Sequence, residues 1–91
     1  MPVGDVHKQL MQQVAEFRDR EAFKSLFQHF APRVKALMIK SGAASGEAED
    51  IAQDVMMRVW LKSIQYSNAK GAVSTWVYTI ARNVRIDRLR R

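Results

Sequence analysis

The 91-residue chain contains no cysteine, only two prolines and only four glycines. Without cysteine it can form neither a disulfide scaffold nor a thiolate metal site. Its two histidines, His7 and His29, are far apart in the sequence and lack the spacing of metal ligands. We therefore expect no metal and no cofactor. Because helix-breaking residues are scarce and 47% of the residues are hydrophobic, most of the chain is expected to fold.

A membrane span and a secretion signal are also missing from the sequence. No apolar run approaches the roughly 18 residues that a spanning helix needs, and residues 1–5 lack the basic and then apolar pattern of a signal peptide. We therefore expect a cytoplasmic protein without membrane insertion. No nucleophile, base and orienting group fall into a recognisable arrangement, so we do not expect an enzyme.

The sequence does contain helical periodicity, and no segment of useful length alternates apolar and polar residues. It predicts an all-α protein, a compact bundle of about four helices in one domain. The expected helices are 5–15 with Asp5 as N-cap, 19–42 with Asp19 as N-cap and an interruption or kink at Pro32, 45–63 with Ser45 as N-cap, and a last helix opened by Ser74. Residues 64–72 are rich in turn formers and predict a loop.

The charge of the chain, formally +6, is segregated along its length. Residues 70–91 carry six cations and one anion, Asp87, whereas residues 47–54 carry four anions and no cation. The six cations are Lys70, Arg82, Arg85, Arg88, Arg90 and Arg91. Two helices of opposite charge indicate two different partners, and the basic one suits a phosphate backbone.

The acidic helix has a normal core stripe and an unusual opposite face. Helical spacing places Ala48, Ile51, Ala52, Val55 and Val59 on the core side. The other side combines carboxylates and an amide with large apolar groups: Glu49, Asp50, Gln53, Asp54, Met57, Trp60 and Leu61. Such a mixture is typical of a protein interface, and the carboxylates repel phosphate, so a basic protein partner is favoured. The alternative is that neighbouring helices bury Met57, Trp60 and Leu61.

The basic helix is built in the same way. Its core stripe is Val73, Val77, Ile80, Ala81 and Val84, and its opposite face carries Thr75, Thr79, Arg82, Asn83, Ile86 and Arg90. Hydroxyl, guanidinium and carboxamide groups bind phosphates or read base edges, which predicts a DNA-binding face. The alternative is a solvated face whose cations are favoured by the helix C-terminus. Trp76 is either a core anchor or a stacking platform.

The segment before the basic helix offers an aromatic side chain and two polar ones, Tyr66, Asn68 and Lys70. Proteins that read single strands combine aromatic walls with polar groups in this way. We interpret residues 66–72 as a candidate pocket for an unstacked base.

Three motifs cover nearly the whole chain. They are Phe23-x-x-Leu26-Phe27 with Pro32-Arg33-Val34, then Ala48-Glu49-Asp50-Ile51-Ala52-Gln53-Asp54-Val55-Met56-x-Arg58-Val59-Trp60, then Ser74-Thr75-Trp76-Val77-Tyr78-Thr79-Ile80-Ala81-Arg82-Asn83 with Ile86-Asp87-x-Leu89-Arg90-Arg91. In this order they resemble region 2 of extracytoplasmic-function sigma factors, the promoter-melting domain of the sigma-70 class.

The resemblance implies roles for both helices in transcription initiation. It implies that Glu49, Asp50, Gln53, Asp54, Met57 and Trp60 dock on the β′ clamp helices of core RNA polymerase. It also implies that the last helix and its preceding loop recognise and melt the promoter −10 element by capturing unpaired bases of the non-template strand. The DNA-binding residues would be Lys70, Ser74, Thr75, Thr79, Arg82, Asn83, Ile86 and Arg90. An anti-sigma protein is a further implied partner.

Family members continue into a region 4 domain that reads the −35 element, and this domain is absent from the chain. Residues 1–91 are therefore expected to be a region 2 domain, either as a fragment or as a single-domain variant. Two other functions stay open from the residues alone: a helix-turn-helix-like module that binds intact duplex, and a helical protein-interaction module with an incidental basic tail.

Overall fold

A computed structural model describes residues 3–67 and 71–90, which form five helices and no strand. The helices are α1 (Val3–Phe17), α2 (Arg20–Lys40), α3 (Ser45–Leu61), α4 (Ser63–Ser67) and α5 (Val73–Leu89). The all-α prediction is confirmed. The predicted loop is partly wrong, because its first residues form the one-turn helix α4. Within the described residues, no helix combines the length and the apolar character that a membrane crossing requires.

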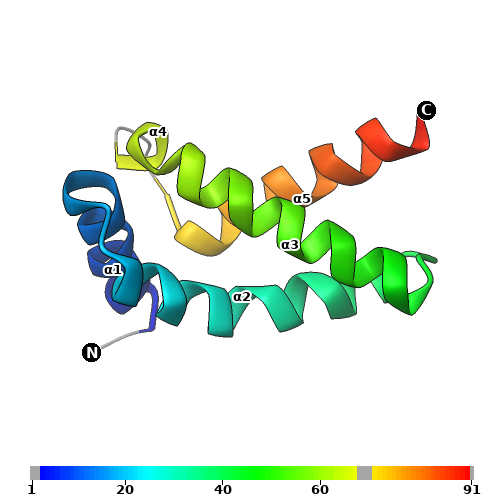
Figure 1. Ribbon diagram of the computed structural model, residues 1–91, viewed down its shortest axis with the longest axis horizontal. Coiled ribbons are helices and arrows are strands. Elements are labelled where there is room, and N and C mark those ends of the chain that lie inside the picture. The colour runs from blue at the N-terminus through cyan, green and yellow to red at the C-terminus, as the bar shows by residue number, and fades with distance from the viewer. Residues whose placement is uncertain (1–2, 68–70, 91) are drawn as a thin grey trace.

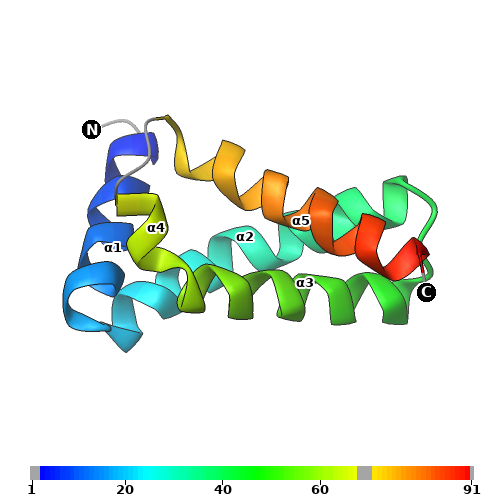
Figure 2. The same ribbon diagram turned by 90° about the horizontal axis from the view of Figure 1, so that it is seen from above.

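Helices α2 and α3 run antiparallel side by side, α5 crosses them, and α1 covers one end of the molecule (Figures 1 and 2). Helices α2, α3 and α5 each contribute fully buried side chains to one core, including Leu26 and Phe30 from α2, Ile51 and Val55 from α3, and Val77 from α5. Their burial removes apolar surface from water, which is the main favourable term in folding.

The ends of the helices agree with the sequence at one predicted cap and differ at two. Asp19 caps α2, because its carboxylate accepts hydrogen bonds from the backbone N–H groups of Glu21 and Ala22 at 3.0 and 3.1 Å. The predicted cap Asp5 lies inside the first turn of α1. The predicted cap Ser45 is the first residue of α3, whose N-cap Ala44 makes no side-chain hydrogen bond. In both cases the residue that was expected to cap the helix lies within it.

The ends of α2 and α3 also differ from expectation. Pro32 lies inside α2 without ending it, and the helix continues to Lys40. The turn after α2 depends on Gly42, whose φ of +106° favours glycine, and whose N–H donates to the Ile39 carbonyl at 3.0 Å. Helix α3 ends at Leu61 and not at Ser63, because Ser63 begins α4.

The two histidines, distant in the sequence, are neighbours in the structure. The rings of His7 on α1 and His29 on α2 lie 4.3 Å apart between centroids, and His7 is only 8% exposed. Burial lowers the pKa of His7, and the nearby His29 and Arg33 lower it further. Burial and Arg33 also lower the pKa of His29. The contact therefore favours neutral rings.

This pair should make the stability of the fold depend on pH. A histidine whose pKa is lowered by folding contributes its full stability above its ordinary pKa of about 6.5, and this contribution is lost as the pH falls below that value. We expect the free energy of unfolding to fall between pH 7.5 and 5.5, and to fall less in His7→Phe, which keeps a buried ring without a titrating group. Urea unfolding at several pH values measures both slopes. Identical slopes for the two proteins would contradict the expectation.

Candidate protein-docking and nucleic-acid surfaces

Helix α3 presents the predicted mixed face to solvent. Its core stripe is buried as expected, and Met56, which the sequence did not assign to the core, is fully buried with it. On the outer face Glu49, Asp50 and Gln53 are exposed, and the exposed fractions of Met57 and Leu61 are 57% and 65%. The alternative that neighbouring helices bury Met57 and Leu61 is therefore wrong. Trp60 is half-buried.

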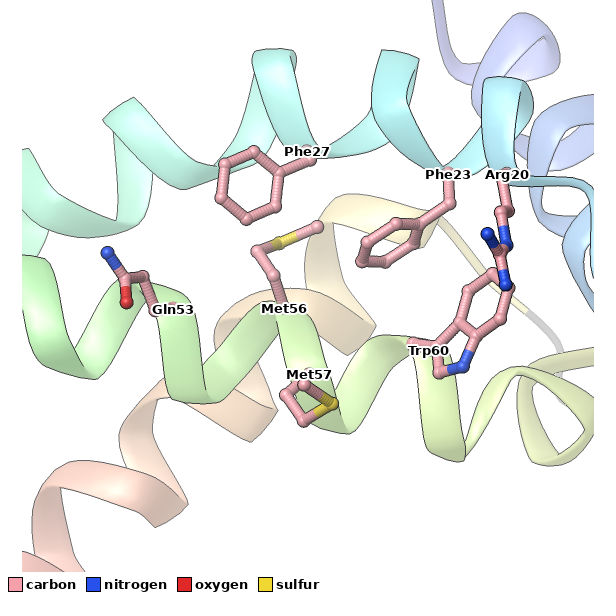
Figure 3. A pocket seen from close by; sticks show the side chains of 7 residues that line it. All are labelled: Arg20, Phe23, Phe27, Gln53, Met56, Met57 and Trp60. Carbon is pink, nitrogen blue, oxygen red and sulfur yellow. The ribbon is translucent and has the colours of Figure 1, made fainter.

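An apolar groove between α2 and α3 adjoins this face (Figure 3). It has a volume of about 630 Å³ and is lined by Arg20, Phe23, Phe27, Gln53, Met56, Met57 and Trp60. The edge of Phe23 meets the ring of Trp60 at 5.2 Å between centroids. We call this feature the α2–α3 groove. Three of its residues, Gln53, Met57 and Trp60, belong to the face that the sequence predicted to bind a protein.

The sequence interpretation missed the α2 wall of this groove. A signal for it exists, because Phe23 and Phe27 are four residues apart and lie next to the buried series Ala22, Leu26 and Phe30. Periodicity shows that such phenylalanines share a helix face, but it does not show that α3 leaves them partly uncovered.

The carboxylates of α3 are not equally available to a partner. Glu49 lies 3.6 Å from Lys35 Nζ, and Asp54 lies 3.4 Å from Arg58 Nε and 3.7 Å from Arg88 Nη2. Glu47 lies 3.6 Å from Arg85 Nη1. Among the described residues Asp50 makes no ion pair with a side chain, so it is the carboxylate of this face most open to a basic partner.

The outer face of α5 is exposed as predicted. Its core stripe is buried, whereas Thr75, Thr79, Arg82, Asn83, Ile86 and Arg90 are exposed and Ser74 is half-buried. Thr79 donates its hydroxyl proton to the Thr75 carbonyl at 2.8 Å, which leaves the hydroxyl oxygen free to accept. The side chains of Arg82, Asn83 and Arg90 have no hydrogen bond or ion pair within the described part of the chain.

Two of the arginines in α5, Arg85 and Arg88, are paired with carboxylates of α3. Part of the basic charge of this helix is therefore neutralised. Arg88 faces Asp54 of α3. Arg85 donates from Nη2 to the Ser41 carbonyl at 3.1 Å, while its buried Nη1 lies 3.6 Å from Glu47, a distance that gives an ion pair without a hydrogen bond. These contacts hold α5 against the turn after α2 and the start of α3.

Tyr66 differs from the open pocket wall that the sequence predicted. Its side chain is only 6% exposed, its ring packs 5.3 Å from Trp76, and its hydroxyl donates to the Gly71 carbonyl at 2.9 Å. Burial raises its pKa. Tyr66 therefore belongs to the core and is joined by its hydroxyl to Gly71, just before α5. Trp76 is a half-buried core anchor. The other two residues assigned to the pocket, Asn68 and Lys70, lie outside the described residues.

Known proteins match the chain over most of its length. The Sigma-70 region 2 family model matches residues 26–91. The RNA polymerase sigma factor RpoE of Cereibacter sphaeroides, of the extracytoplasmic-function (ECF) type, is 50% identical over 82 residues, which are 90% of this chain and 45% of that protein. The ECF sigma factor SigK of Mycolicibacterium vanbaalenii is 33% identical over 81 residues, 89% of this chain and 41% of that protein.

A solved structure has the same fold. Rhodobacter sphaeroides SigE, crystallised in complex with the anti-sigma ChrR, superposes with a TM-score of 0.87 and 49% identity, covering 92% of this chain and 51% of SigE. The chain thus spans about half the length of the proteins it matches.

The hydrogen bond of Tyr66 gives a testable prediction. Tyr66→Phe keeps the packing on Trp76 but removes the donor to Gly71, which should lower the free energy of unfolding by about 1 kcal/mol. Tyr78→Phe is the matched control, because Tyr78 is half-buried and its hydroxyl has no hydrogen-bond partner in the described residues. Urea unfolding of both variants tests this, and equal losses would contradict the role of Tyr66.

Proposed function

This chain belongs to the Sigma-70 region 2 family, in the extracytoplasmic-function group, and from this premise we propose that it binds core RNA polymerase through α3 and opens promoter DNA through α5. The observation that carries the proposal is the pair of exposed outer faces on one core. One is apolar and acidic beside the α2–α3 groove, and the other is polar and basic. The chain acts as an initiation factor and not as an enzyme.

The proposed docking surface for the β′ clamp helices consists of Glu49, Asp50, Gln53, Asp54, Met57 and Trp60. The exposed Met57 and the half-buried Trp60, surrounded by charge, supply the apolar centre and polar rim of a protein interface. Glu49, Asp50, Gln53 and Met57 are its exposed members, and of these Glu49 is paired with Lys35. Asp54 lies at its edge, because it already faces Arg58 and Arg88.

The proposed DNA surface consists of Lys70, Ser74, Thr75, Thr79, Arg82, Asn83, Ile86 and Arg90. Here Arg82 and Arg90 contact phosphates of the non-template strand, while Asn83 and Thr79 contact base edges of the −10 element. Melting by this surface needs no hydrolysis. Capture of unpaired bases shifts the equilibrium between paired and unpaired DNA, because the surface has a higher affinity for the unpaired state.

A flipped base needs a pocket that offsets an unstacking cost of a few kcal/mol. We assign this pocket to residues 66–72, with Asn68 and Lys70 as its polar groups. Tyr66 is buried and donates to the Gly71 carbonyl, so we do not assign it a stacking role.

Regulation by an anti-sigma protein is also part of the proposal. The SigE structure is a complex with an anti-sigma protein, and its fold and sequence are close to those of this chain. We expect a similar partner to compete for the surfaces described above, in the cytoplasm where polymerase and promoter DNA are found.

Asn83 provides a test of the DNA surface. Asn83→Ala should weaken binding to single-stranded −10 oligonucleotides by roughly 1 to 3 kcal/mol, because a carboxamide offers both a donor and an acceptor to a base. Fluorescence anisotropy with oligonucleotides of varied sequence measures this. Gln12→Ala, which removes an exposed carboxamide from α1, is the control. Equal affinities of Asn83→Ala and the wild type for every oligonucleotide would count against the assignment.

The same titrations distinguish strand capture from duplex binding. A generic duplex-binding module would bind double strands as well as single strands and would show little preference among exposed −10 bases. The proposed function requires preference for the single strand.

Asp50 provides a test of the docking surface. Asp50→Arg should weaken association with core polymerase about tenfold or more, because it reverses the open carboxylate that faces a basic partner. Asp50 is preferred over Asp54, whose reversal would also disturb Arg88 of α5. Glu16→Arg makes the same charge change on exposed α1 and should bind normally. If Asp50→Arg still co-purifies with core enzyme as the wild type does, the docking surface lies elsewhere.

A further inference from the structure

Arg18 connects the turn between α1 and α2 to the junction of α3 and α4, which is distant in the sequence. It lies between α1 and α2, and its Nη1 donates to the Trp60 carbonyl at 2.8 Å and to the Ser63 hydroxyl oxygen at 3.0 Å. Ser63 is fully buried, and its own hydroxyl donates to the Trp60 carbonyl at 3.1 Å. One guanidinium therefore binds the end of α3 and the start of α4.

The same guanidinium also covers the Trp60 ring. Its Cζ lies 4.0 Å from the ring centroid, a distance that allows a cation–π interaction. Phe23 contacts the ring edge-on at an interplanar angle of 69°. Trp60 is thus held by Arg18 on its ring face and by Phe23 at its edge. Figure 3 shows Phe23 and Trp60 where they line the α2–α3 groove.

The backbone of Arg18 adopts a conformation that arginine does not favour. Its φ is +51°, in the left-handed region, at the end of α1 where glycine is the usual residue. Glycine would form the same corner with less strain. The turn alone does not explain why an arginine and not a glycine occupies this position. The contacts of its guanidinium with Trp60 and Ser63 supply an explanation.

We propose that Arg18 is a positioning residue for polymerase docking: it fixes the orientation of Trp60 in the α2–α3 groove without itself contacting the partner. This inference rests on the proposed function, because Trp60 belongs to the proposed docking surface. Arg18 acts on one of the two surfaces only, since its contacts reach α3 and α4 and none reaches the outer face of α5.

The test is the variant Arg18→Gly, which keeps the left-handed corner and removes the guanidinium. Thermal unfolding and single-strand DNA binding should stay close to those of the wild type, while affinity for core polymerase falls about threefold to tenfold. Arg33→Ala removes an exposed arginine from α2 outside both surfaces, and it should retain polymerase affinity. Parallel losses of stability, DNA binding and polymerase binding in Arg18→Gly would make Arg18 a structural residue and overturn the proposal.

A double-mutant cycle shows whether Arg18 acts through Trp60. Trp60→Leu keeps an apolar side chain and removes the ring, so adding Arg18→Gly to it should cause no further loss of polymerase affinity. A full additional loss would mean that Arg18 contacts the polymerase directly, which contradicts the inference. If Trp60→Leu and Asp50→Arg both leave polymerase binding intact, the proposed docking surface fails, and with it the role of Arg18.

Discussion

The burial of three apolar stripes against one another determines where the other side chains of this molecule point. Val34 of α2, Val55 of α3 and Val77 of α5 are each completely buried in the common core. Because a helix that buries one face presents the opposite one, the outer faces of α3 and α5 are exposed together on a single core. Two surfaces of different chemistry then follow without any hinge or second domain.

The ion pairs between α3 and α5 contribute little to stability, but they determine which charged side chains remain available to partners. The ion pairs between α3 and α5 join Glu47 to Arg85, Asp54 to Arg88 and Arg58 to Asp87, at 3.6 to 3.9 Å. Most of their groups are a third to a half exposed, and pairs of this kind contribute about 0 to 1 kcal/mol each. Their main effect is on availability: they neutralise the sides of α3 and α5 that face each other and leave Asp50 and Arg82 open to partners.

The sequence predicted the helices, the core stripes and the exposed outer faces because each depends on spacing along a single helix. All five predicted core positions of α5 are buried, and the polar residues opposite them are exposed. It did not predict what depends on contacts between helices. The α2 wall of the groove, the His7–His29 contact and the reach of Arg18 to Trp60 each join segments whose relative placement no local pattern specifies. Local errors lie at helix ends, where the boundary is least well specified by the sequence, as at Ser45, which is the first helical residue because the extended Ala44 takes the N-cap position.

The distribution of free cations bears on how the proposed DNA surface works. The chain carries a formal charge of +6, but on the outer face of α5 the described cations without a partner are Arg82 and Arg90. Electrostatic affinity for nucleic acid grows with the number of phosphates neutralised, so two arginines give weak binding that depends little on sequence. Useful affinity must then come from groups such as Asn83 and Thr79, which reach base edges best when the bases are unpaired. The small number of free cations therefore favours strand capture over duplex binding. It also implies that the proposed DNA surface depends on the proposed polymerase contact of α3 to hold it at the promoter.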